Sequence, residues 1–184
     1  VAQALDDPAG IYLNPALINI GFWPGGDRDG NPFVDAKTTW HVAERLRATI
    51  LRCYRREIRD LRRRITFKHV SEILDQLQDQ IEFAMLHPED ERLSVIELTK
   101  RLEEVADLVQ QHSNGLYIER VRAFLFKLRL FGLHFASMDI RQDSRVIQSA
   151  LDDALESMDM DVSVFRAKSK KEQVDFLFSW STNE

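Results

Sequence analysis

The chain has 184 residues, with 25 basic and 30 acidic side chains and a formal net charge of −5. Apolar residues make up 44% of it, so a core can form, and the modest acidity argues against a dedicated nucleic-acid binder, although not against a local basic patch. Cys53 is the only cysteine, which excludes an internal disulfide and, with no signal peptide visible, leads us to expect a cytoplasmic protein.

The N-terminal part predicts a loop and then a strand. Residues 1–16 read as a loop, and Leu17–Trp23 is short, apolar and β-leaning, so we expect a buried strand there. The strand stops at residues 24–26, and a loop rich in Gly, Asp and Asn follows as far as Pro32. Residues 17–34 therefore form one predicted unit, a strand and the polar loop at its end.

Residues 35–131 predict a long run of helices. Asp35 is a good N-cap, and apolar residues then recur at three- and four-residue steps. The expected helices run to about Ile65, then over Lys68–Leu86, Leu93–Gln111 and Leu116–Phe131. The last of these is apolar on most sides, so we expect it to be deeply buried. The longest apolar stretch, Ala123–Met138, contains Lys127, Arg129 and His134, which argues against a membrane span.

Residues 132–184 predict a second strand followed by helices. His134–Ile140 alternates, which places Phe135, Ser137 and Asp139 on one face, and helices are expected over Ser144–Met158 and Lys170–Trp180. The predicted fold class is mainly α, with long helices and two short strands. Because two short strands do not make a stable sheet, we expect the chain to be a piece of a longer polypeptide that holds the other strands.

From the residue types and their order in the chain, Arg28 is the best functional candidate. Each predicted strand is followed by an arginine-bearing turn and then a helix, the βα order in which functional groups gather where strands end. If the strands are parallel neighbours, Arg28 and Arg141 share one rim. Arg28 can donate two hydrogen bonds to a phosphate or carboxylate, with Asp27 and Asp29 orienting it. The alternative is a tight turn whose Arg and Asp residues pair only with one another.

Two motifs carry a family resemblance. Residues 22–34, FWPGGDRDGNPFV, resemble the GGDRDGNPxVT signature of phosphoenolpyruvate carboxylases, and residues 131–144, FGLHFASMDIRQDS, are similar to the family's FGxxLxxLDIRQES signature. Both occur in the family's order. Asp35 replaces a Thr and Asp143 a Glu, and both changes are conservative. The family's catalytic histidines, metal-binding carboxylates and later glycine-rich loop are not found in this sequence.

The resemblance implies a fold, a reaction and partners. It implies a fragment of a (β/α) barrel in a homotetrameric, magnesium-dependent lyase. Such a lyase would fix carbon dioxide and supply oxaloacetate to the tricarboxylic acid cycle. Bicarbonate would attack the phosphate of phosphoenolpyruvate, and carbon dioxide would add to the resulting enolate. Arg28 would be catalytic and substrate-binding, Arg141 substrate-binding or structural, and four residues would support the site: Asp27, Asp29, Asn31 and Asp139. The magnesium ligands would lie in the remainder of the parent enzyme, so we expect the fragment alone to be inactive.

The segment 45–64 is unusually rich in arginine. Its nine arginines are Arg45, Arg47, Arg52, Arg55, Arg56, Arg59, Arg62, Arg63 and Arg64. We expect a solvated or subunit-contacting face, balanced by an acidic helix that carries Glu72, Asp75, Asp79 and Glu82. Two alternatives to the carboxylase depend on this segment: an autonomous helical interaction module, and a helical nucleic-acid-binding domain. Nucleic acid is the less favoured partner because no aromatic residues are interleaved for base stacking.

Overall fold

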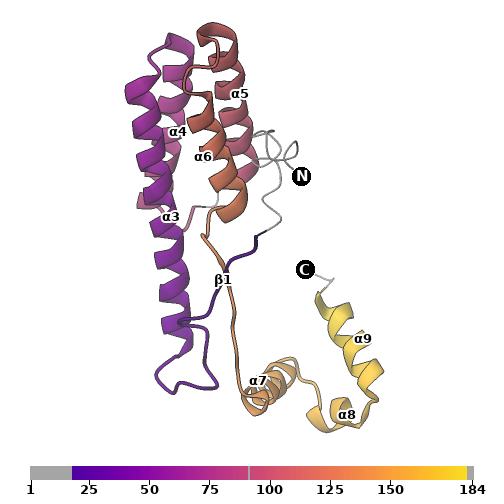
Figure 1. The fold of residues 1–184 in the computed structure, drawn as a ribbon. Helices are drawn as coiled ribbons and strands as arrows, with labels where there is room; N and C mark the ends of the chain where they lie inside the picture. Colours follow the sequence, from indigo (N-terminus) through magenta and orange to yellow (C-terminus); the bar gives the residue numbers. More distant parts are fainter. Residues whose placement is uncertain (1–17, 91, 182–184) are drawn as a thin grey trace, which may run out of the picture.

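The computed structural model describes residues 18–90 and 92–181, and these are mainly helical with two short parallel strands (Figure 1). The loop expected over residues 1–16, and Leu17, lie outside the described residues. In chain order the elements are β1 (Gly21–Phe22), α3 (Ala36–Arg64), α4 (Lys68–Leu86), α5 (Val95–Ser113), α6 (Ile118–Phe131), β2 (Ser137–Met138), α7 (Ser144–Ser157), α8 (Val162–Ala167) and α9 (Lys170–Ser181).

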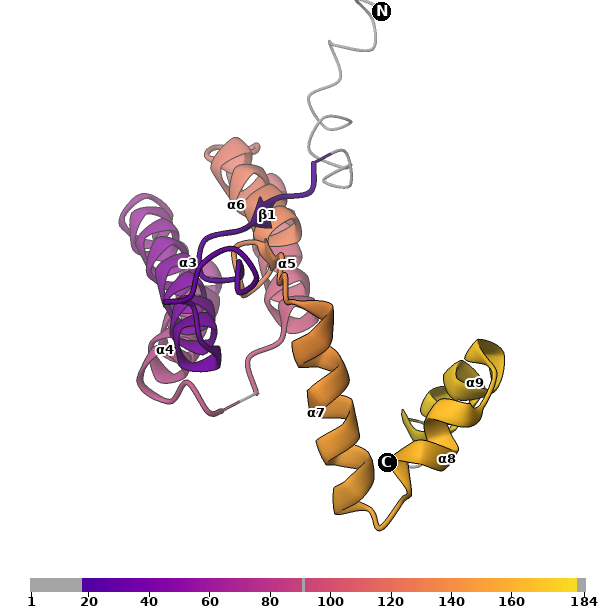
Figure 2. The same cartoon turned by 90° about the horizontal axis from the view of Figure 1, so that it is seen from below.

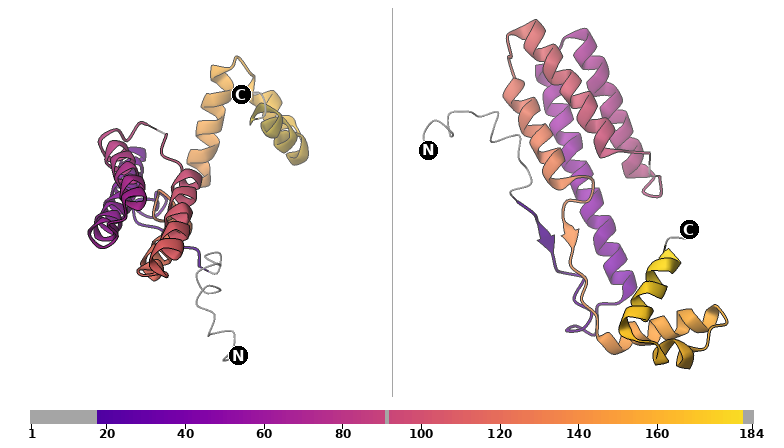
Figure 3. Two further views of the ribbon diagram at one scale, coloured as in Figure 1. Left: turned by 90° about the horizontal axis from the view of Figure 1, so that it is seen from above. Right: turned by 90° about the vertical axis from the view of Figure 1, so that its right-hand side faces the viewer.

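Helices α3 to α6 pack side by side as a bundle around one core (Figures 1 and 3). The core is built from the apolar stripes that the sequence predicts. Its most deeply buried members are Leu51, Tyr54, Ile58, Leu61, Ile65, Val70, Leu74, Leu77, Ile81, Ala84, Leu102, Val105, Val109, Val121, Phe124 and Leu128. Each buried side chain larger than alanine stabilises the fold by about 1.5–3 kcal/mol, so the bundle rests on hydrophobic burial.

The helix ends follow the capping signals in the sequence. The Asp35 carboxylate accepts from the Thr38 amide at 2.7 Å, as expected for an N-cap. Hydrogen bonds from the Thr38 side chain and amide lower the pKa of this carboxyl. Asn114, at φ 48°, ends α5 in the left-handed conformation. The predicted span Lys68–Leu86 is confirmed, whereas α5 begins two residues later than expected because Ser94 is its cap.

Both strands are shorter than the alternation predicts, and they are not buried. Phe135 has φ 72°, so the chain is not extended there, and the pairing that defines β2 covers only Ser137 and Met138. In β1, Gly21 is exposed and Phe22 is half-buried, and Trp23 beyond it is 51% exposed. The expectation of a buried strand is therefore wrong for this chain, because within the described residues each strand has one neighbour only.

The C-terminal helices project away from the bundle (Figures 1 and 2). Helix α7 buries Leu155 but exposes Val146 and Ile147, at 49% and 56%. The six-residue α8 is not among the elements predicted, since so short a helix shows no periodicity; it buries Phe165, whose ring lies 5.7 Å from that of Phe176. These helices leave apolar surface uncovered by the rest of the described chain.

Candidate active-site loop

The main chains of Arg28 and Arg141 meet where the two parallel strands end. Gly21 pairs with Ser137 and Phe22 with Met138, and the ladder continues beyond the strands. The Arg141 amide donates to the Gly26 carbonyl at 2.8 Å, and the Arg28 amide donates to the Arg141 carbonyl at 2.9 Å. The parallel neighbourhood and the shared rim expected of the two arginines are therefore present in the structure. Figure 3 shows β1 and β2 side by side along the N-terminal half of α3.

Two glycines allow this pairing. Gly25 has φ 83°, a left-handed conformation, and a β-carbon there would lie 2.6 Å from the Val42 side chain. A β-carbon on Gly26 would lie 2.1 Å from the carbonyl oxygen of Asp139. At Gly26 the close approach is made by the chain's own backbone, which brings the rim together.

The Arg28 side chain is held without a carboxylate partner. The residue is half-buried, and its Nε atom is buried with no hydrogen-bond partner. Within residues 18–90 and 92–181 no acidic side chain forms an ion pair with it. The sequence suggested that Asp27 and Asp29 would orient the guanidinium, and the structure does not pair either of them with it. A cation fixed by its backbone but not neutralised is suited to bind an anion.

The Asp27 carboxylate interacts with that of Asp29. Partial burial and the carboxylate of Asp29 raise the pKa of Asp27, while Trp23 and Arg141 oppose that shift. The Asp27 carboxylate also lies close to Gly30, whose β-carbon position is 2.9 Å from one carboxylate oxygen. Asp27 therefore packs against Gly30 inside the loop, and its ionised form destabilises the folded state.

Arg141 is placed differently from Arg28. Its guanidinium lies 3.7 Å from the Asp139 carboxylate and 6.0 Å from the centre of the Trp23 ring. Both members of the ion pair are more than half exposed, so the pair is weak. Arg141 thus makes the ion pair with Asp139 that the structural alternative expects, while substrate binding by its exposed guanidinium stays a prediction.

Asn31 and Thr39 fix the far side of the loop. The Asn31 side-chain oxygen accepts from the Phe33 amide at 3.0 Å, which makes a local turn. The Thr39 hydroxyl donates to the Gly25 carbonyl at 2.8 Å and so ties the loop to the first turns of α3. Sequence reasoning missed Thr39, and its position one turn after the Asp35 cap was the available signal.

The described residues contain no ready metal centre. Among residues 18–90 and 92–181, no three His, Cys, Asp or Glu side chains gather closely enough to hold an ion. The histidines lie on the surface: His69 is beside Glu72, and His87 stacks on Phe83 with 4.3 Å between ring centres.

In the same part of the chain no helix is both long and apolar enough to cross a membrane.

Comparison with known proteins identifies the family. Residues 2–97 and 84–183 match the family model described as phosphoenolpyruvate carboxylase. The chain is 29% identical to the phosphoenolpyruvate carboxylase of Xanthomonas euvesicatoria pv. vesicatoria (strain 85-10), over 80% of this chain and 20% of that protein. It is 29% identical to that of Ralstonia nicotianae, over 77% and 18%, and 27% identical to that of Aeromonas hydrophila, over 72% and 18%.

The chain thus spans about a fifth of the length of the curated relatives that it matches. The two matched segments together cover almost all of its length, including the loop at Arg28 and the ladder to Arg141. This chain belongs to the phosphoenolpyruvate carboxylase family.

Proposed function

We propose that this chain is one piece of a phosphoenolpyruvate carboxylase, which converts phosphoenolpyruvate and bicarbonate to oxaloacetate and phosphate. The observation that carries the proposal is Arg28, held at the end of two parallel strands with no carboxylate to neutralise it. We assign it to the phosphate of phosphoenolpyruvate or to bicarbonate. Arg141 keeps the loop in place through the backbone ladder, and its side chain is secondary.

The reaction explains why an unpaired guanidinium is useful. A bicarbonate oxygen attacks phosphorus while the bond from phosphorus to the enol oxygen breaks, which gives carboxyphosphate and the enolate of pyruvate. Carboxyphosphate then releases phosphate and carbon dioxide, and the enolate carbon attacks carbon dioxide to form oxaloacetate. Negative charge is spread over the phosphoryl oxygens during transfer, and a fixed bidentate donor stabilises it. A guanidinium already bound to a carboxylate would do this less well.

Magnesium belongs to the proposal only for the parent enzyme. The described residues do not bring together enough carboxylate or imidazole ligands for a complete magnesium site. We therefore assign the magnesium ligands, together with the catalytic histidines, to the remainder of the parent enzyme. The cytoplasmic location and the homotetramer are likewise proposals that rest on the family.

Oxaloacetate formation tests the proposal. The longer polypeptide that carries this segment is expected to form oxaloacetate when phosphoenolpyruvate, bicarbonate and magnesium are present. Malate dehydrogenase, added as the coupling enzyme, reduces the oxaloacetate and oxidises NADH, which is measured. The isolated 184-residue chain is expected to show no activity. Turnover by the isolated chain would contradict the assignment of the metal and histidines elsewhere, and no turnover by the folded longer polypeptide would contradict the carboxylase itself.

A further inference from the structure

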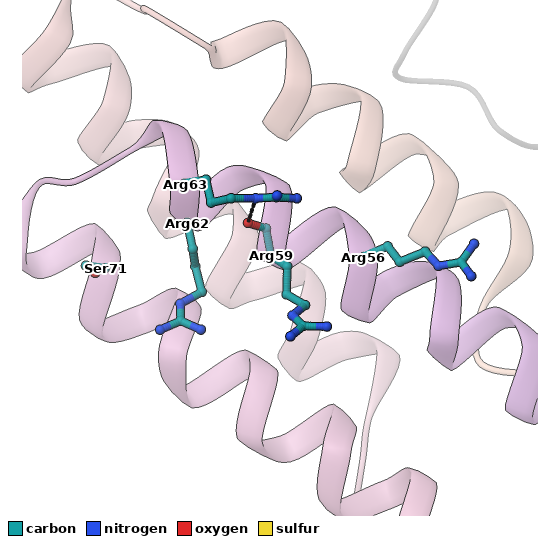
Figure 4. A pocket seen from close by; sticks show the side chains of 5 residues that line it. All are labelled: Arg56, Arg59, Arg62, Arg63 and Ser71. Atoms are coloured by element: carbon teal, nitrogen blue, oxygen red, sulfur yellow. Dashed lines mark hydrogen bonds between the residues drawn. The ribbon is translucent and has the colours of Figure 1, made fainter.

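The C-terminal third of α3 and the start of α4 enclose an open groove that is strongly basic. Its volume is about 630 Å³, and the side chains that line it are Arg56, Arg59, Arg62, Arg63 and Ser71. Figure 4 shows the guanidinium groups of Arg59 and Arg62 extending to the same side of α3, toward α4, with Ser71 on α4 nearby. We call this set the arginine groove. It lies about 30 Å along α3 from the loop at Arg28, at 1.5 Å per residue.

The acidic residues of α4 neutralise only part of this charge. Arg62 forms an ion pair with Asp75 and donates to the Gln78 side chain at 2.6 Å, and Arg55, outside the groove, lies 3.9 Å from Glu82. On another side of α3, Asp60 holds Arg64 and Arg120 at 3.1 and 3.0 Å. The charge balance expected between the arginine-rich α3 and the acidic α4 is therefore present at Asp75 and Glu82, but it does not extend to the other arginines of the groove.

Among the described residues, two guanidinium groups in the groove, those of Arg56 and Arg59, stay without a carboxylate, and the Asp60 charge acts on that of Arg63 without forming a direct ion pair. Within the part of the chain that the structure describes, Arg56 and Arg59 form no ion pair or side-chain hydrogen bond, and Arg63 makes only a 3.3 Å bond from Nε to the Arg59 carbonyl. Residues three, four and seven apart share one helix face, so these like charges repel one another. The groove carries an electrostatic cost that a bound anion would remove.

The helix dipole does not account for all of these arginines. Cations in the last turn of a helix are stabilised by its C-terminal partial charge, and this covers Arg62 and Arg63. Arg59 and Arg56 lie before the last turn, where the dipole effect has fallen off. Nothing in the fold of the described residues requires positive charge at these two positions.

We propose that the arginine groove binds a phosphate group of a small ligand. The backbone positions of Arg59, Arg62 and Arg63 span about 6 Å along the helix axis, a length that suits one phosphate better than an extended polyanion. Guanidinium groups provide paired donors for phosphate oxygens, and the half-buried Ser71 hydroxyl adds a donor from α4. Since no lining residue is aromatic, the groove has no platform on which bases would stack.

Calorimetric titration of the 184-residue chain with inorganic pyrophosphate, at constant ionic strength, tests the proposal. Arg59→Gln and Arg63→Gln are each expected to weaken binding at least about tenfold, as loss of a charge-assisted hydrogen bond predicts. The control is Arg52→Gln, an exposed arginine of α3 outside the groove whose Nε bonds to the Ala48 carbonyl; its affinity should stay within about twofold. Equal weakening by the control, or no binding by the folded parent chain at millimolar pyrophosphate, would overturn the proposal.

Two further measurements separate the site from other roles. Without ligand, Arg59→Gln should leave the melting temperature unchanged or raise it, because it removes repulsion. A clear drop would mean that Arg59 stabilises the fold, and the site would then be rejected. A single-stranded oligonucleotide should not displace pyrophosphate at equal phosphate concentration; displacement with a steep salt dependence would instead identify a nucleic-acid surface.

Discussion

The amide of Arg28 donates to the carbonyl of Arg141 at 2.9 Å, although the whole helical bundle separates the two residues in the sequence. This bond and the one from the Arg141 amide to Gly26 join the two signature motifs at the level of the main chain. The position of Arg28 is therefore set by backbone pairing and does not depend on its own side-chain contacts.

Gly26→Ala is expected to disrupt the rim. The new methyl group would lie 2.1 Å from the Asp139 carbonyl oxygen, so the ladder must open, at a cost of about 1–3 kcal/mol. Gly21→Ala is the matched control, because no atom lies within 4 Å of the position that its methyl group would take. Urea unfolding, followed by circular dichroism, compares the two. Equal stability of both variants would show that the close approach at Gly26 is not maintained in solution.

Tyr54→Phe should loosen the connection between the bundle and β2. The Tyr54 hydroxyl is buried and donates to the Gly132 carbonyl at 2.7 Å, at the turn that leads from α6 toward β2, and burial raises its pKa strongly. Removing the donor leaves a carbonyl unsatisfied, so we expect a loss of about 1–2 kcal/mol in the free energy of unfolding.

Tyr117→Phe serves as the control for that loss. The hydroxyl of Tyr117 makes no hydrogen bond within the described residues, and the residue is half-buried. Denaturant unfolding of both variants should give a lower midpoint for Tyr54→Phe only. A similar decrease in the two variants would mean that the bond to Gly132 adds nothing.

Asp27→Asn should stabilise the chain at neutral pH. Burial and Asp29 raise the pKa of Asp27 in the folded state, so the protonated form of Asp27 stabilises the folded chain. The free energy of unfolding therefore falls as the pH rises through the raised pKa. A neutral amide avoids this loss. The melting temperature of Asp27→Asn should therefore exceed that of the parent chain at pH 7, and the difference should vanish below the ordinary carboxyl pKa of 3.8.

Asp35→Asn is expected to behave in the opposite way. The bonds from Thr38 lower the pKa of Asp35, so its charged form stabilises the folded state above the ordinary pKa, and this stability is lost on acidification. Melting curves at pH 7 and pH 3 for both variants give the comparison. If both substitutions shifted stability in the same direction at pH 7, the assignment of the Asp27 shift to its surroundings would be wrong.

The sequence predicts the helices well and the rim only in part. Apolar periodicity and the cap at Asp35 give the bounds of α3 and α4 because both signals are local. The second strand is shorter than predicted because Phe135 takes a positive φ, which alternation does not reveal. Neighbours in sequence suggested that Asp27 would pair with Arg28, yet the Arg28 main chain pairs with distant Arg141 and the Asp27 carboxylate interacts with Asp29. Contacts between distant segments decide the chemistry of this site.

The most direct test of the account is the rate of oxaloacetate formation by the longer enzyme with Arg28→Lys. Lysine keeps the charge but not the paired donors, so we expect the carboxylation rate to fall about ten- to hundredfold while the circular dichroism spectrum stays the same. Arg45→Lys, on the exposed face of α3, is the control and should keep full activity. An unchanged rate in Arg28→Lys would contradict the role of Arg28 in binding the reacting anion.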